Sequence, residues 1–140
     1  MSDDPIAVIN RFADAVRAND PEAAANTYAE DVILVDPRYN TVGRDGARDA
    51  FGYWLGAFEV TSFEVVETIV QDTRVAAHLK WTALHRGEYM GVPATNQIFS
   101  GWNVALFDTK DGYVTRDLSV WDCTQLLALQ ELASRGEKRA

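Results

Sequence analysis

Apolar residues recur every three or four positions along the N-terminal part of the chain, which predicts helices. The first helix is expected to begin with Asp4 as N-cap and Pro5 as first residue, because proline lacks only an N–H that would have no partner there. Its buried face would be formed by Ile9, Phe12, Ala13 and Val16. Asp20 and Pro21 repeat the signal and predict a second, alanine-rich helix that ends near Tyr28.

The next segment predicts a short strand and a third helix. Consecutive apolar residues indicate a buried strand at 32–36, and residues 37–46 are expected to form a loop. Asp45 is expected to cap the third helix, whose apolar face would consist of Ala47, Phe51, Trp54, Leu55 and Phe58. Gly52 and Gly56 lie within this helix, where each costs roughly 1 kcal/mol relative to alanine unless a neighbour packs closely on it.

From residue 62 onward the period of the hydrophobic pattern changes to two, which predicts strands. Four long strands are expected, at 62–71, 74–90, 96–108 and 113–122. Their short connections, with Gly112 able to take a positive φ in the last one, favour an antiparallel meander. An amphipathic segment from about Thr124 predicts a closing helix, and residues 136–140 a frayed tail. We therefore expect one domain spanning residues 1–135.

Helices gathered in the first part of a chain and strands in the second are typical of an α+β fold. The helices should cover one face of a curved antiparallel sheet. The other face is expected to carry two apolar rows, Trp102, Val104 and Leu106 on one strand and Val114, Leu118 and Val120 on the next. Because an apolar outer face usually marks a subunit interface, the pattern predicts a homodimer through this face.

Composition narrows the classes of partner. The chain has 140 residues, enough for one domain with a sizeable core, and its net charge of −8 argues against nucleic acid and anionic membranes as partners. The single Cys123 cannot form an internal disulfide. The N-terminus lacks the pattern of a signal peptide, and no apolar stretch is long enough to cross a membrane. We expect a cytoplasmic protein that binds neither nucleic acid nor membranes.

Two aspartates occupy unusual positions. Asp36 follows the apolar run directly and precedes Pro37. A carboxylate against apolar walls has a raised pKa, which suits proton transfer, but aspartate before proline is also a common turn residue. Asp117 lies in the middle of a predicted strand, where aspartate is unfavourable, and shares a face with Ser119 and Trp121. It would point into a pocket if the opposite face forms the dimer; an exposed aspartate paired with a neighbour is the alternative.

The order of elements resembles the SnoaL-like polyketide cyclases of the nuclear-transport-factor-2-like superfamily and, more distantly, the ketosteroid isomerases. The most specific motif is "LHRGEYMGVPATNQ" at 84–97, which is similar to the family's His-x-Gly-Glu and Gly-x-Pro-x-Thr pattern and precedes a "VWD" strand ending at 120–122. The resemblance covers nearly the whole chain and implies a cone-shaped α+β barrel with an internal pocket. It does not fix the reaction, because this fold hosts isomerases, cyclases, epoxide hydrolases, dehydratases and non-enzymes.

The resemblance also implies roles for single residues. Asp36 matches the position of the isomerase general base, and Asp117 is the best match to the catalytic acid/base that the cyclases carry on their last strand. Asn103 stands where the isomerase has an oxyanion-hole acid; its amide can donate to an enolate but cannot supply a proton. Phe12 stands where the isomerase has its oxyanion tyrosine. Both changes argue against steroid isomerase activity.

Further candidates are weaker. His85 shares a face with Trp81 and Ala83, so it could line the pocket rim as a second acid/base or be an ordinary surface residue. Aromatic walls suited to a planar or polycyclic ligand are expected from Phe12, Tyr28, Tyr39, Trp54, Phe58, Phe99 and Trp121, although the same side chains would serve as core. Because metal-ligand spacing, a phosphate-binding glycine loop and a dinucleotide fingerprint are all missing from the sequence, we expect no cofactor.

The leading interpretation is a cofactor-free cyclase or isomerase acting on a small hydrophobic, polyketide-like carbonyl compound. Asp117 or Asp36 would move the proton, and Asn103 or His85 would stabilise the enolate. Two alternatives stay open. One is an epoxide hydrolase or dehydratase, weakened because Arg116 falls on the strand face opposite Asp117. The other is a non-catalytic domain for small-molecule binding or dimerisation.

Overall fold

The structure is a computed structural model that describes residues 4–122, 124, 128 and 131. Its elements, in chain order, are α1 (Pro5–Arg17), α2 (Pro21–Asn26), β1 (Tyr28–Val35), β2 (Asn40–Val42), α3 (Arg44–Ala57), β3 (Phe58–Gln71), β4 (Arg74–His85), β5 (Ile98–Lys110) and β6 (Tyr113–Trp121). The predicted closing helix falls almost wholly outside the described residues, and the tail at 136–140 wholly so. No helix in the described part of the chain is long and apolar enough to span a bilayer.

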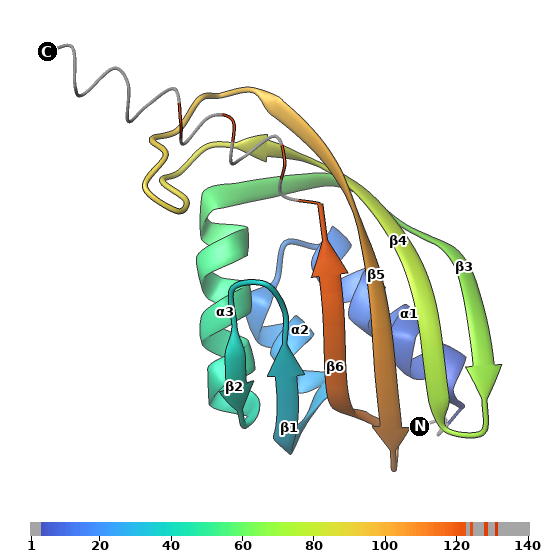
Figure 1. Cartoon of the computed structure of the whole chain (residues 1–140). Coiled ribbons are helices and arrows are strands. Elements are labelled where there is room, and N and C mark those ends of the chain that lie inside the picture. Colours follow the sequence, from blue (N-terminus) through green and yellow to red (C-terminus); the bar gives the residue numbers. More distant parts are fainter. Residues whose placement is uncertain (1–3, 123, 125–127, 129–130, 132–140) are drawn as a thin grey trace, which may run out of the picture.

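The strands form a single curved, open sheet in the order β2-β1-β6-β5-β4-β3. The three helices lie on its concave side (Figure 1). All neighbouring strands are antiparallel except β1 and β6, which run parallel. The predicted α+β fold, with three helices against one face of a curved sheet, is confirmed, and so is the meander of four long strands.

Two of the three helix starts follow the predicted caps. Asp4 accepts from the backbone N–H of Ile6 at 2.9 Å, and Asp20 caps α2 in the same way. The prediction for α3 was wrong: its N-cap is Gly43, at a φ of 100° that favours glycine, and Asp45 instead lies in the first turn. The chain must reverse direction sharply between β2 and α3, and glycine permits that turn.

Strand pairing over long range moves several predicted boundaries. Helix α2 ends at Asn26, and Tyr28 begins β1 because it pairs with Val114 of β6. Strand β2 lies inside the segment predicted as loop, where Thr41 pairs with Leu34. Phe58 begins β3 and does not belong to the apolar face of α3.

Alternation along the strands separates a helix-covered inner face from an outer face. On the outer face the side chain of Trp102 is 42% exposed and that of Val120 is 58% exposed. Both therefore lie on the face where the two apolar rows were expected. Val114 was wrongly placed in those rows, since it is fully buried. Opposite Asp108 and Thr109, strand β6 contains one extra residue, Thr115, and this bulge turns Val114 to the inner face.

Candidate functional site

A cavity of about 100 Å³ lies between α1, α3 and the inner face of the sheet. Its wall is mostly aromatic and aliphatic, with four polar side chains from three different segments: Asp36, Asn103, Asp117 and Ser119. The predicted site residues that line it are Phe12, Asp36, Tyr39, Trp54, Asn103, Asp117 and Trp121. The sheet therefore brings both candidate carboxylates and the candidate amide to one cavity.

Asp117 is the most enclosed polar group of the cavity. It lies on the inner face of β6, is 5% exposed, and accepts hydrogen bonds from the hydroxyls of Tyr28 and Ser119. Burial raises its pKa from 3.8 to about 6; the two hydroxyl donors lower it, and the charge of Asp36 raises it further. A carboxyl with this pKa is mainly ionised at neutral pH and is readily protonated, which suits a general base.

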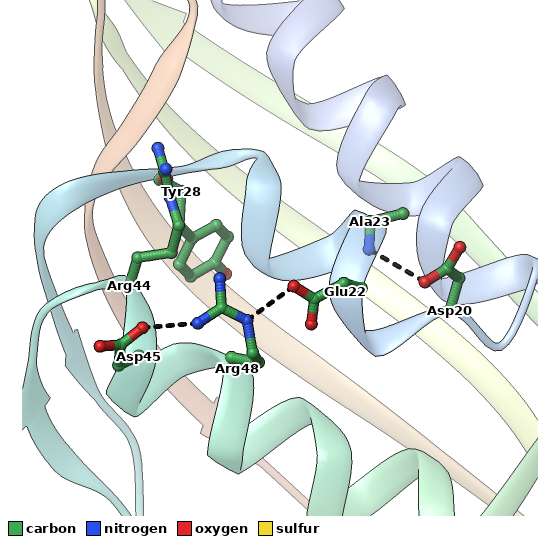
Figure 2. A network of polar contacts seen from close by, with 7 residues as sticks. All are labelled: Asp20, Glu22, Ala23, Tyr28, Arg44, Asp45 and Arg48. Atoms are coloured by element: carbon green, nitrogen blue, oxygen red, sulfur yellow. Dashed lines mark hydrogen bonds and ion pairs between the residues drawn. The ribbon is translucent and has the colours of Figure 1, made fainter.

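Tyr28 does not line the cavity as predicted, but stands behind Asp117. Its side chain is fully buried, and burial together with the neighbouring Asp117 raises the pKa of its phenol, so it stays a donor. Arg44 Nε donates to the Tyr28 carbonyl at 2.8 Å. Figure 2 shows Arg48 between Asp45 and Glu22. The ion pair with Glu22 connects α3 to α2 near Tyr28. Tyr28 thus positions the carboxylate.

Asp36 combines the two roles considered for it. Its Oδ1 accepts from the backbone N–H groups of Arg38 and Tyr39, each at 2.7 Å, so it does begin a turn after β1. The same half-buried side chain also lines the cavity. Burial raises its pKa, while the two backbone donors and the charge of Arg38 lower it. Asp36 is therefore a second carboxyl of the cavity, held by its own turn.

The amide of Asn103 is oriented by a tryptophan. Trp81 Nε1, which can only donate, lies 2.9 Å from Asn103 Oδ1. This bond assigns the amide oxygen and leaves Nδ2 as the group able to donate to a ligand. Gly101 makes room for the indole: a Cβ there would lie 2.3 Å from Trp81 Cζ2. Asn103 is thus a preorganised donor on the cavity wall.

His85 was wrongly placed at the pocket rim. It is fully buried beyond the cavity, where its ring stacks on Phe58 at 4.9 Å and packs near Phe99 at 5.3 Å. Its Nδ1 lies 3.0 Å from Thr95 Oγ1, and burial lowers its pKa, which favours the neutral ring. Phe58 and Phe99 pack around this histidine and do not line the cavity. Strands β4 and β5 extend beyond the cavity, and the aromatic cluster at this end is separate from it.

Sequence reasoning missed two tyrosines, Tyr53 and Tyr89, and the arginine that contacts both, Arg38. Tyr89 lines the cavity from a tight turn in which its backbone pairs with Val92 in both directions. The guanidinium of Arg38 lies over the rings of Tyr39, Tyr53 and Tyr89, 5.0 to 5.7 Å from their centroids. The motif at 84–97 was noted for its resemblance alone, and only the folded turn shows that it delivers Tyr89.

Comparison with known proteins agrees with this architecture. A sequence model of the SnoaL-like polyketide cyclases matches residues 7–130, so the chain belongs to this family. No protein among the curated sequences matches it.

Solved structures show the same fold. AclR, a proposed hydroxylase from Streptomyces galilaeus, is 24% identical, with 89% of this chain and 82% of that chain covered and a TM-score of 0.77. IdmH, a proposed polyketide cyclase from Streptomyces antibioticus, is 20% identical over 91% and 99% of the two chains, with a TM-score of 0.75. A Catenulispora acidiphila protein with a ketosteroid isomerase-like fold is 18% identical over 87% and 90%, with a TM-score of 0.70. At these identities the likeness shows the fold alone.

Proposed function

We propose that this protein is a cofactor-free cyclase or isomerase-type enzyme that acts on a hydrophobic, polyketide-like carbonyl compound, with Asp117 as the principal general base. One observation carries the proposal. Asp117 is buried, accepts hydrogen bonds from the hydroxyls of Tyr28 and Ser119, and lies in the same cavity as the oriented amide of Asn103. Membership of the polyketide cyclase family supports the substrate class.

The proposed step is proton removal next to a carbonyl group. The ionised Asp117 takes a proton from the α-carbon, and the electron pair of the broken C–H bond moves to the carbonyl oxygen as an enolate. Asn103 Nδ2 donates to that oxygen, an interaction that strengthens as negative charge develops. The α-carbon of the enolate then attacks a second carbonyl carbon, and the alkoxide that forms takes the proton from Asp117, which closes a ring. Where the enolate is conjugated with a C=C bond, Asp117 instead returns the proton to the far carbon of that system, and the double bond moves.

Asp36 is the second carboxyl in this scheme. Its charge raises the pKa of Asp117 and so makes Asp117 a stronger base. Because Oδ1 of Asp36 is engaged by the turn at Arg38 and Tyr39, Oδ2 is the atom left to exchange a proton with the product. The water-addition alternative gains no support from Arg116, whose Nη1 lies 3.9 Å from Asp108 Oδ2 on the outer side of the sheet.

Mass spectrometry on a substrate panel tests the proposal. The wild type, Asp117→Asn, Asp36→Asn and the surface control Asp31→Asn are each incubated with β-ketoesters, enones and epoxides. We expect the wild type and Asp31→Asn to convert a carbonyl compound and Asp117→Asn to lose roughly 10²–10⁴-fold in rate. Conversion by Asp117→Asn at the wild-type rate would instead assign the base to Asp36, and turnover of epoxides alone would favour the hydrolase alternative.

The outer face of the sheet supports a homodimer. Trp102, Val104, Leu106 and Val120 are each more than 40% exposed and lie on the adjacent strands β5 and β6. Exposed apolar side chains in such a contiguous group are typical of interfaces between subunits. Sedimentation equilibrium of the wild type should give twice the mass of the chain, and Val104→Lys should give the monomer; a monomeric wild type at micromolar concentration contradicts the dimer.

A further inference from the structure

The cavity in which Asp36 and Asp117 lie carries negative charge on mostly aromatic and aliphatic walls. We infer that it binds small organic cations, compounds whose tertiary or quaternary ammonium group lies between the two carboxylates and the aromatic rings. This ligand class is separate from the carbonyl substrate proposed above. The inference concerns binding alone and does not depend on turnover.

The charge of the cavity is not balanced by basic side chains. Among the described residues that line it, Asp36 and Asp117 are acidic and none is a lysine, arginine or histidine. Neither carboxylate takes part in the ion pairs that the described part of the chain forms. The hydroxyls of Tyr28 and Ser119 donate to Asp117 and stabilise its charge, but they do not neutralise it. Since buried charges in proteins are usually paired with an opposite charge, a cationic ligand complements this cavity.

One arginine acts on the cavity from behind its lining. The charge of Arg38 lowers the pKa of Asp36, but the guanidinium lies over three tyrosine rings and is not itself a lining group. Among the described residues, the charge that shifts the pKa of Asp117 is that of Asp36, which is also negative. A cation beside Asp117 therefore meets a carboxylate that no positive side chain already compensates.

Both carboxylates keep oxygen lone pairs for a ligand. A carboxylate oxygen can accept two hydrogen bonds. In Asp117, Oδ2 accepts from Tyr28 and Oδ1 from Ser119, so each oxygen has one lone pair left. In Asp36, two backbone donors engage Oδ1 and leave Oδ2. The N–H of a tertiary ammonium can donate to one of these atoms, and the alkyl groups of a quaternary ammonium, which carry part of its charge, can contact them.

The aromatic rings of the walls favour an organic cation over a metal ion. Nine of the 17 lining side chains are aromatic, and Trp54, Trp81 and Trp121 are among them. A ring face attracts a cation through its quadrupole, most strongly in tryptophan, and proteins recognise quaternary ammonium groups in this way. A metal ion needs several oxygen, nitrogen or sulfur ligands, and the described residues contain no group of three acidic, histidine or cysteine side chains that could hold one.

The cavity is partly open to solvent. Asp36, Tyr39, Trp54 and Trp121 line it and are only half-buried. A ligand can therefore place its ammonium group in the cavity while the remainder extends outward. The cavity selects the charged end of the ligand and does not limit its length.

Two probes of the same shape test the inference. Choline carries a trimethylammonium group and a hydroxyl, and 3,3-dimethylbutan-1-ol replaces the charged group with a neutral tert-butyl group. Calorimetric titration at about pH 7.5, in roughly 0.1 M salt, should show choline binding roughly tenfold more tightly, because only choline gains charged contacts with the rings and carboxylates. Equal or weaker binding of choline would overturn the inference, and so would no binding of choline.

Indole signals in ¹H–¹⁵N spectra report where choline binds. Those of Trp54, Trp81 and Trp121, which line the cavity, should shift, while that of Trp102 on the outer face should not. A shift of Trp102 alone would place the cation outside the cavity and contradict the assignment.

Removal of single charges separates the cavity from the acidic surface of a chain with a net charge of −8. Asp117→Asn should lower the affinity for choline roughly tenfold and leave that for the neutral alcohol nearly unchanged. Asp31→Asn is the matched control, because this carboxylate is exposed and does not line the cavity. An equal loss in Asp31→Asn, or no loss in either Asp117→Asn or Asp36→Asn, would refute the role of the cavity carboxylates.

Acidification gives a readout within the wild type. Asp117 has a pKa of about 6, so the affinity for choline should fall several-fold from about pH 7.5 to about pH 5, and most of this fall should be lost in Asp117→Asn. Asp36 titrates in the same direction and Arg38 stays charged. Burial raises the pKa of the three nearby phenols, which stay neutral: Tyr28, Tyr39 and Tyr89. An affinity that does not change with pH would count against the inference. Choline binding without turnover would leave the inference standing while the proposed function fails, and turnover without choline binding would do the reverse.

Discussion

Replacing Asp117 with asparagine should remove a pH-dependent cost to folding. The carboxyl has a pKa of about 6 in the folded protein and an ordinary value of 3.8 when exposed to solvent. One pKa unit corresponds to about 1.4 kcal/mol, so the ionised side chain destabilises the folded state by roughly 3 kcal/mol relative to an ordinary aspartate. Asparagine stays neutral at every pH and carries no such cost.

The sign of the effect follows from the order of the two pKa values. Below about pH 4 Asp117 is protonated in both states and contributes nothing. Between about pH 4 and pH 6 the unfolded chain ionises while the folded protein holds its proton, so the cost grows. Above about pH 6 both states are ionised and the cost is constant. The free energy of unfolding of Asp117→Asn minus that of the wild type should therefore rise by roughly 3 kcal/mol from pH 4 to pH 7. Above pH 7 this difference should stay level.

Urea unfolding at half-unit steps from pH 3.5 to pH 8, in roughly 0.1 M salt, measures this difference. A difference in hydrogen bonding between protonated Asp117 and asparagine shifts the whole curve by a constant, whereas the hydrogen bonds to the ionised carboxylate are already contained in its pKa. Asp31→Asn removes an exposed carboxylate and serves as the surface control. A flat difference between pH 4 and pH 7 for Asp117→Asn would refute the argument that burial governs this carboxyl.

Three further outcomes follow from the packing. Tyr28→Phe removes a donor that lowers the pKa of Asp117, so the midpoint of the step above should move to higher pH, as a ¹³C titration of the carboxyl would show. Gly52→Ala should stabilise the protein by roughly 0.5–1 kcal/mol in urea unfolding, because Gly52 lies mid-helix and a Cβ there meets nothing within 4 Å. Gly101→Ala should destabilise it by roughly 1–3 kcal/mol and shift the indole signal of Trp81, because the added methyl group collides with that ring.

Local signals in the sequence sufficed for much of the fold. The caps at Asp4 and Asp20 depend only on a side chain and the N–H groups two or three residues later, so their sequence pattern is reliable. The inward direction of Asp117 followed from alternation along a single strand and from the apolar character of the opposite face.

Other features depend on partners distant in the sequence. The parallel pairing of β1 with β6 makes Tyr28 a strand residue behind Asp117 and not a wall of the pocket. The bulge at Thr115 turns Val114 inward, and no local pattern marks it. His85 lies on the predicted face of β4, but at the end of the strand, outside the cavity. How far the cavity extends along β4 depends on where α3 packs, which the sequence of the strand does not show.

Deuterium exchange into a simple ketone tests the central claim most directly, that Asp117 removes a proton next to a carbonyl in this cavity. Phenylacetone carries one ring and an activated methylene group, and ¹H NMR in D₂O follows the loss of its α-protons. The wild type should accelerate exchange, and Asp117→Asn should lose that acceleration by roughly 10²–10⁴-fold. Exchange at the wild-type rate in Asp117→Asn would contradict the account.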